Sequence, residues 1–188
     1  MGHRLLSALV SVAVMAFVMS FAVSIEAQTV APGPYYAVPS WDQILPSSTR
    51  FIVLSNWNSE AVLDRETGLV WQRNPSVVTQ VFSSAKLSCH FAKTGNRAGW
   101  RLPSVHEFRS LIDPSVNSPT ELSLPAGHPF VVGLPAGTVY WTGTTVALNP
   151  LYAYGTGLRH GDGLGQLEKQ VQTFAAWCVR GGGPISVD

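Results

Sequence analysis

The segment Gly99-Trp100-Arg101-Leu102-Pro103-Ser104-Val105-His106-Glu107-Phe108 carries the strongest structural pattern of this 188-residue chain. Pro103 lacks an N–H group and holds the residue before it in extended geometry. Ser104 and Glu107 have the S-x-x-E spacing of a capping box, in which each side chain accepts from the other residue's backbone N–H. Apolar residues follow at helical spacing, at Val105, Phe108, Leu111 and Ile112. We therefore predict an extended segment leading into a short helix, which ends at Asp113-Pro114.

The first 27 residues have the pattern of an export signal. His3 and Arg4 precede an uncharged run of 19 residues, and Ala27 offers a small-residue cleavage site. An uncleaved membrane anchor is the alternative, because a spanning helix needs about 20 apolar residues. The fit of Ala27 to cleaved signals favours cleavage before Gln28. We expect an exported protein that is periplasmic, on the cell surface or secreted.

The chain that follows the signal suits one domain. Residues 28–49 contain five prolines or glycines, which predicts an exposed arm or linker. Residues 50–188 form the predicted domain. Without Arg4 and Glu26, 11 basic residues balance 10 acidic ones. We expect no nucleic-acid partner for such a near-neutral chain.

Cys89 and Cys178 are the only cysteines of the sequence. An isolated pair in an exported chain is typical of a disulfide, which here would join a helix to the last strand. A redox-active or nucleophilic thiol is the alternative. Two observations argue against it. The chain has no C-x-x-C motif, and an exported protein enters an oxidising compartment, which favours the disulfide.

Short apolar runs and turn residues indicate an α+β fold with a curved antiparallel sheet and two helices on one side. A hairpin is predicted from residues 61–64 and 69–72, joined by a turn that ends at Gly68. The spacing of Phe82, Ala85, Cys89 and Ala92 predicts a helix over residues 81–93. Further strands are expected at residues 50–55, 139–144, 151–154 and 174–180. Residues 113–138 are predicted to form a long loop, and residues 155–165, with five glycines, a mobile connector.

Five of these pieces, in order, resemble the Lcl C-terminal domain family, a largely uncharacterised group of exported bacterial domains. The matching pieces span residues 61–181 and are Asp64-x-x-Thr67-Gly68-Leu69-Val70-Trp71-Gln72, the Ala85 to Cys89 helix, Gly99-Trp100-Arg101-Leu102-Pro103 with Glu107, Tyr140-Trp141-Thr142 and Trp177-Cys178-Val179-Arg180. The resemblance implies a C-type lectin-like fold. The related formylglycine-generating enzymes work through reactive cysteines. The only two cysteines of this chain are those of the predicted disulfide. The calcium-binding motifs of C-type lectins have no match here, so the resemblance implies neither activity.

A basic edge is the candidate ligand-binding site. It consists of Lys86, His90, Lys93 and Arg97, at helical spacing beside the predicted buried stripe. Such an edge can bind a sulfated or phosphorylated polyanion. The alternative is an ordinary solvated helix face.

The other conspicuous residues have structural roles in our interpretation. We expect burial for the large rings, and a structural partner for Arg101. These expected structural residues are Gly68, Trp71, Trp100, Arg101, Leu102, Pro103, Ser104, Glu107 and Trp141. Trp41 and Trp57 lie outside the strongest motifs and are the expected exposed rings.

The sequence contains no compact metal-ligand spacing, catalytic motif or cofactor fingerprint, so we expect no metal, no cofactor and no enzyme. Our hypothesis is a non-enzymatic binding module at the cell envelope or surface. Its partner would be a glycan or polyanion, or an envelope protein. One alternative is an envelope hydrolase with a site built from loop residues such as His160 and Asp162. Another is a purely structural envelope component.

Overall fold

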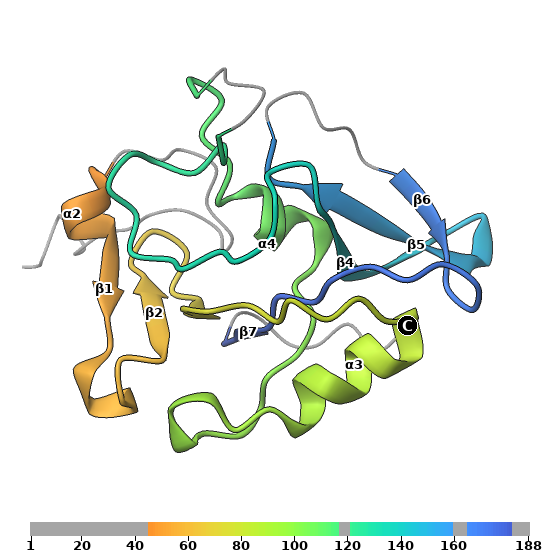
Figure 1. Ribbon diagram of the computed structural model, residues 1–188, viewed down its shortest axis with the longest axis horizontal. Coiled ribbons are helices and arrows are strands. Elements are labelled where there is room, and N and C mark those ends of the chain that lie inside the picture. Colours follow the sequence, from red (N-terminus) through yellow and green to blue (C-terminus); the bar gives the residue numbers. More distant parts are fainter. Residues whose placement is uncertain (1–44, 117–120, 160–164, 182–188) are drawn as a thin grey trace, which may run out of the picture. The chain divides into compact units, whose positions relative to one another are not determined.

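The computed structural model describes residues 45–116, 121–159 and 165–181, and these contain two antiparallel sheets (Figure 1). The four-stranded sheet has the order β1-β2-β3-β7 and the three-stranded sheet the order β4-β5-β6. The strands of the two sheets are β1 (Phe51–Val53), β2 (Ala61–Asp64), β3 (Val70–Gln72), β4 (Val139–Val146), β5 (Asn149–Gly157), β6 (Gly165–Glu168) and β7 (Val179–Arg180). The helices are α2 (Ser47–Arg50), α3 (Phe82–Phe91) and α4 (Val105–Arg109), with 3-10 turns η1 (Ser55–Trp57) and η2 (Thr94–Asn96).

The predicted mixed α+β class with antiparallel strands is confirmed, but the single curved sheet is wrong. Figure 1 shows β1 and β2 at the left, β4 to β6 at the right, and β7 between them, with α3 below. The last apolar segment links the two sheets. Ala175 bonds with the backbone of β4 at Val139 and Trp141, and Val179 pairs with Trp71 of β3. Before β7, Gln72 N donates to Cys178 O at 3.2 Å, and the side chain of Gln72 accepts from Cys178 N at 3.1 Å.

The hairpin of β2 and β3 forms as predicted. Gly68 closes its turn at φ +70°, a conformation that glycine adopts without steric cost. Its turn also carries a buried charge cluster that the sequence did not indicate. Arg50 donates to both carboxylate oxygens of Asp64, at 2.9 and 2.8 Å, and lies 3.3 Å from Glu66. Glu66 in turn accepts from Leu45 N, so the described end of the predicted arm, residues 45–49, packs on the domain.

The predicted connector of residues 155–165 is wrong over the part that the structure describes. β5 continues through Gly157, and Gly165 opens β6 opposite Gly155. A side chain at Gly155 would collide with Leu167 of the neighbouring strand. These glycines therefore permit close packing within the sheet rather than a loose loop. Residues 160–164 lie outside the described residues.

The capping box at the start of α4 is confirmed. Ser104 Oγ accepts from Glu107 N at 3.2 Å, and the Glu107 carboxylate accepts from Ser104 N at 2.7 Å. The helix ends at Arg109, before the predicted Ile112. Arg101 holds this helix against the residue that follows β7, because its guanidinium donates to both oxygens of Glu107 and to Gly181 O. Its expected structural role therefore agrees with its contacts.

The same segment is held against both sheets. Arg101 and Val179 exchange two backbone hydrogen bonds of 2.9 Å. On the other side, Pro103 O accepts from Gly143 N at 2.7 Å, and Thr144 Oγ1 accepts from Val105 N. Residues 101–105 thus connect β7 with β4.

Large aromatic rings fill the core, as predicted. Trp71, Trp100, Trp141 and Trp177 are all buried. Trp177 packs edge-on against Trp71, Phe108 and Phe130, and this aromatic group joins the four-stranded sheet to α4. Burial also raises the pKa of Tyr140, in the same group, to about 12. No helix among the described residues is long and apolar enough to cross a membrane.

Candidate basic surface on helix α3

The four residues of the basic edge are all exposed. Lys86 and His90 lie one turn apart on α3, Lys93 lies between α3 and η2, and Arg97 follows η2. Residues four apart on a helix are neighbours on its surface. The fold therefore presents Lys86 and His90 side by side and continues the positive charge into residues 93–97.

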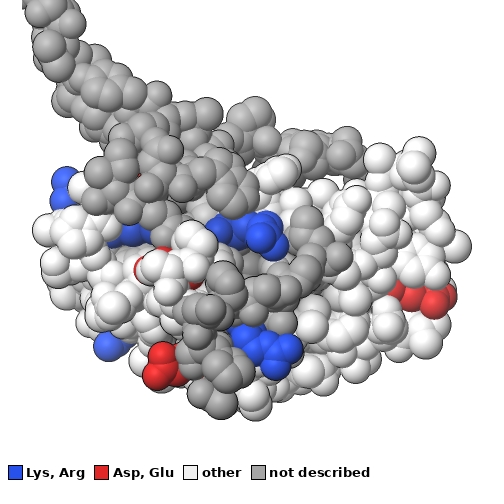
Figure 2. Space-filling model, turned by 90° about the horizontal axis from the view of Figure 1, so that it is seen from above, with Lys and Arg blue, Asp and Glu red and all other residues white. Residues whose placement is uncertain are grey.

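Other basic residues do not gather in this way on the face drawn in Figure 2. There the described Lys and Arg side chains lie apart from one another, with acidic side chains among them, and the right-hand part of the face carries none. This view looks down from the top of Figure 1, whereas α3 lies at the bottom of Figure 1. The basic edge is therefore on a different side of the molecule from the face of Figure 2.

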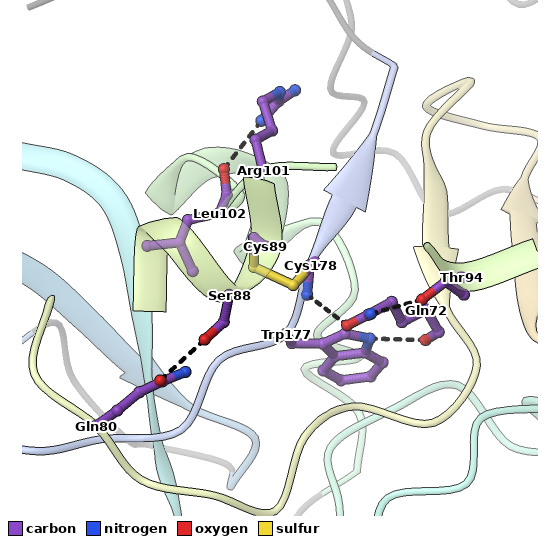
Figure 3. Close-up of a disulfide and its surroundings, with 9 residues drawn as sticks. All are labelled: Gln72, Gln80, Ser88, Cys89, Thr94, Arg101, Leu102, Trp177 and Cys178. Atoms are coloured by element: carbon purple, nitrogen blue, oxygen red, sulfur yellow. Dashed lines mark hydrogen bonds between the residues drawn. A yellow bond between two sulfur atoms is a disulfide. The ribbon is translucent and has the colours of Figure 1, made fainter. Parts of the chain in front are cut away.

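Helix α3 is fixed to the domain by the predicted disulfide (Figure 3). Cys89, buried on the inner face of α3, is bonded to Cys178, and the pair leaves no free cysteine. Phe82 and Ala85 are buried on the same face, so the cysteine points inward as its spacing indicated. Gln72 supports the bridge, since it accepts from Cys178 N and donates to Thr94 Oγ1 at 2.8 Å. The basic edge thus lies on a covalently anchored helix.

Two cations meet on one aromatic ring at the start of α3. Lys86 Nζ lies 5.8 Å and Lys169 Nζ 4.9 Å from the centre of the Phe82 ring. Lys169 also donates to Thr145 Oγ1 and Pro150 O, both at 2.8 Å. Partial burial and, second, the positive charge of Lys86 lower the pKa of Lys169. Lys169 therefore adds a cation to this end of the edge.

Trp57 forms the other end of the surface. The guanidinium carbons of Arg97 and Arg180 lie 5.4 and 5.3 Å from its ring centre, and Gly95 packs against its Cβ. The ring is half-buried, whereas its place outside the strongest motifs predicted an exposed ring. Instead, the ring positions two arginines, whose flat guanidinium groups stack favourably on it. The extended basic surface, as we use the term, comprises Lys86, His90, Lys93, Arg97, Lys169 and Arg180.

A hollow of about 350 Å³ lies close to this end of the surface. It is lined by Ser59, Glu60, Arg73, Asn74, Thr94 and Val131. Glu60 reaches η2 and accepts from Gly95 N at 2.6 Å, while Arg73 donates to Pro129 O and Ser59 O. The carboxylate and the guanidinium give the hollow a balanced charge. Its hydroxyl, amide and ionic groups can hydrogen-bond an uncharged polar ligand.

Several predicted site residues do not join this surface. Gly68 closes the β2–β3 turn, and the motif residues 100–107 form the junction of α4 and β7. His128 is half-buried and stacks on Phe130, and this burial lowers its pKa. Three further residues lie outside the described residues: Trp41, His160 and Asp162. The export signal of residues 1–27 lies outside them as well. Among the residues that are described, no group of three potential metal ligands comes together.

Lys169 and Arg180 were missed from the sequence because they lie far along the chain from the basic edge. For Arg180 the sequence did contain a signal. Arg180 ends a family motif that includes Cys178, and the predicted disulfide joins Cys178 to Cys89 on α3, which places Arg180 near that helix. Lys169 had no comparable local pattern.

The sequence profile of the Lcl C-terminal domain matches residues 60–180, nearly two thirds of the chain. The match begins just before β2 and ends with β7, and it includes α3 with its disulfide. No curated protein matches this chain.

Proposed function

This chain belongs to the Lcl C-terminal domain family, and on that premise we propose that it is an exported, non-enzymatic module that binds a polyanionic glycan at the cell envelope or surface. The observation that carries the proposal is the extended basic surface on α3 and around Trp57. A partner protein with an acidic surface is the alternative ligand.

The geometry of the surface suits a chain of repeated negative charges. Lys86 and His90 lie about 6 Å apart along the helix axis, at 1.5 Å per residue. Arg97 and Arg180 are held on one ring further along. Arginine binds sulfate or phosphate through paired N–H groups, and lysine binds it as a point charge. Because α3 is tied to the core by a disulfide, little ordering of its backbone is needed when the ligand binds.

We propose no catalytic role. The hydrolase alternative needs histidine and a carboxylate that converge on a cleft. His128, the half-buried histidine, accepts from Phe130 N through Nδ1 and stacks on the Phe130 ring, which is a structural use of the side chain. Loss of a measured hydrolytic activity on changing His160 or Asp162, with the fold intact, would replace our proposal with the enzyme.

Export is also part of the proposal. The disulfide supports it, since such bonds persist in oxidising compartments. Mass spectrometry of the protein isolated from its cells tests it directly. We expect a mature chain that begins at Gln28. A chain that keeps residues 1–27 would support the anchored structural component instead.

We further propose that the fold is C-type lectin-like. Two antiparallel sheets, the helices α3 and α4, and a disulfide between α3 and Cys178, next to β7, support this finer assignment. An experimental structure that superposes on such domains over both sheets is the expected result. A different strand connection would restrict the assignment to the α+β class.

Retention on immobilised heparin across a salt series tests the ligand class. We expect salt-sensitive retention, because charge-dominated binding weakens with ionic strength. The triple variant Lys86→Glu/Lys93→Glu/Arg97→Glu should not be retained. The matched control is Arg65→Glu/Arg109→Glu/Arg159→Glu, which has the same net charge but changes residues outside the basic surface. Equal loss in both variants would show an effect of net charge alone and contradict the proposed site.

The hollow beside η2 favours one second candidate, an uncharged glycan. Its balanced lining of Glu60, Arg73 and Asn74 would not reject a neutral sugar. Binding to neutral oligosaccharides that persists at high salt and falls with Asn74→Ala would support this candidate. Binding that disappears at high salt would exclude it in favour of the polyanion.

A further inference from the structure

Helix α3 exposes two large apolar side chains on its outer face. Leu87 is 55% and Phe91 67% exposed, and they lie one turn apart. They point away from Phe82 and Cys89, which are buried on the opposite side. Leu87 and Phe91 thus form a small exposed apolar ridge on a helix whose opposite face is anchored to the core.

The two flanks of this apolar ridge differ. Lys86 and His90 lie on one flank and Lys93 follows at the end of the helix. On the other flank, Ser88 Oγ is 2.9 Å from Gln80 Oε1 and ties α3 to the preceding extended segment. That segment exposes Val77 and Val78. The face therefore combines an apolar centre with a cationic border.

We propose that this face of α3 docks on an anionic lipid surface, with Leu87 and Phe91 in the acyl boundary and Lys86 and Lys93 at the headgroups. The proposal rests on the polyanion-binding function and names the partner of the same surface. It adds a role for the apolar ridge, which that function leaves unused.

For the exposed side chains of Leu87 and Phe91, the chemistry favours lipid over the other anionic partners. A sulfated glycan supplies charge but has no acyl region in which Leu87 and Phe91 could be buried. A stable protein partner would cover a larger area than two side chains on a short helix. Helices that lie in a membrane interface pair Phe or Leu with flanking Lys, and anionic headgroups attract each cation near the surface. The cationic border alone suits a polyanion, whereas the border together with the apolar centre suits an anionic lipid surface.

Vesicle co-sedimentation tests the proposal with disulfide-bonded protein that was expressed with its own leader and shown by mass spectrometry to have lost it. The probes are vesicles of phosphatidylcholine alone and vesicles with added phosphatidylglycerol. We expect partition only onto the anionic vesicles. Leu87→Ser/Phe91→Ser should reduce partition about tenfold or more, because each change removes a large apolar side chain that the membrane would bury. The same variant should keep its retention on heparin.

A matched control removes exposed apolar side chains elsewhere. Leu148, 99% exposed, lies in the turn between β4 and β5, and Leu151, 60% exposed, lies near the start of β5. The variant Leu148→Ser/Leu151→Ser should bind anionic vesicles like the parent. Unchanged vesicle binding by Leu87→Ser/Phe91→Ser would overturn the proposal. Parent protein that binds heparin but not anionic vesicles would also overturn it while the polyanion function stands, and failure of both probes would overturn both.

Discussion

Replacing Glu107 by alanine removes three short hydrogen bonds at once. The Glu107 carboxylate accepts from Arg101 Nη1 at 2.7 Å, from Arg101 Nη2 at 2.6 Å and from Ser104 N at 2.7 Å. Burial by itself opposes ionisation of this carboxyl, but the hydrogen bonds from Arg101 and Ser104 outweigh burial and lower its pKa from 4.5. The ionised carboxylate therefore stabilises the folded state.

The expected loss of unfolding free energy is about 3 kcal/mol. Loss of one helix-cap interaction costs about 1 kcal/mol. Loss of hydrogen bonds between charged groups costs about 1.5 to 3 kcal/mol. We take about 2 kcal/mol for the ion pair, because the Arg101 side chain is 24% exposed and regains water when Glu107 is removed. For a domain of this size, about 3 kcal/mol lowers the melting temperature by roughly 10 °C.

Urea unfolding at pH 7 measures this loss, and a double-mutant cycle separates its parts. Ser104→Ala should cost about 1 kcal/mol, the cap alone. Arg101→Ala, Glu107→Ala and the double variant should give a coupling energy of about 1 to 2 kcal/mol between the two side chains. A loss below about 1 kcal/mol in Glu107→Ala, or a coupling energy near zero, would refute the role of this junction in stability.

Three further perturbations have expected outcomes. The pKa of Glu107 lies below 4.5 in the folded state, so its carboxylate stabilises the protein above pH 4.5 and this stabilisation is lost as the pH falls further. The urea midpoint should therefore decline less between pH 7 and pH 3 in Glu107→Ala than in the parent protein. Cys89→Ala/Cys178→Ala should lower the unfolding free energy by about 4 kcal/mol, and a change below about 1 kcal/mol would show that the bridge contributes little. Gly95→Ala should cost about 1 kcal/mol more than Gly68→Ala, although both have positive φ, because only at Gly95 would the new methyl lie 2.7 Å from Trp57 Cβ. Equal urea midpoints for the two glycine variants would contradict that contact.

The local patterns of the sequence predicted the parts of the fold that depend on neighbouring residues. The capping box of Ser104 and Glu107 formed because its two hydrogen bonds need only a four-residue segment. The turn at Gly68 formed for a similar reason. The disulfide was predictable because the chain has only two cysteines, and one of them lies on the buried stripe of α3.

The long-range arrangement was not predictable in the same way. Gly155 resembles a loop residue in sequence, and only the position of Leu167 on the next strand shows why it has no side chain. Arg50 and Asp64 are charged residues that sequence patterns place at the surface, yet their mutual hydrogen bonds allow complete burial. The candidate site was half predicted. Its helical part follows from residue spacing, whereas Lys169, in the turn after β6, and Arg180, in β7, are distant from α3 in sequence.

A titration of the isotope-labelled protein with a short heparin fragment, followed by backbone amide chemical shifts, tests the proposed binding surface most directly. We expect the largest shifts in residues 86–97 and at Lys169 and Arg180, and we expect added salt to reverse them. Shifts that instead gather on the face of Figure 2, or the absence of shifts at low salt, would contradict polyanion binding by α3.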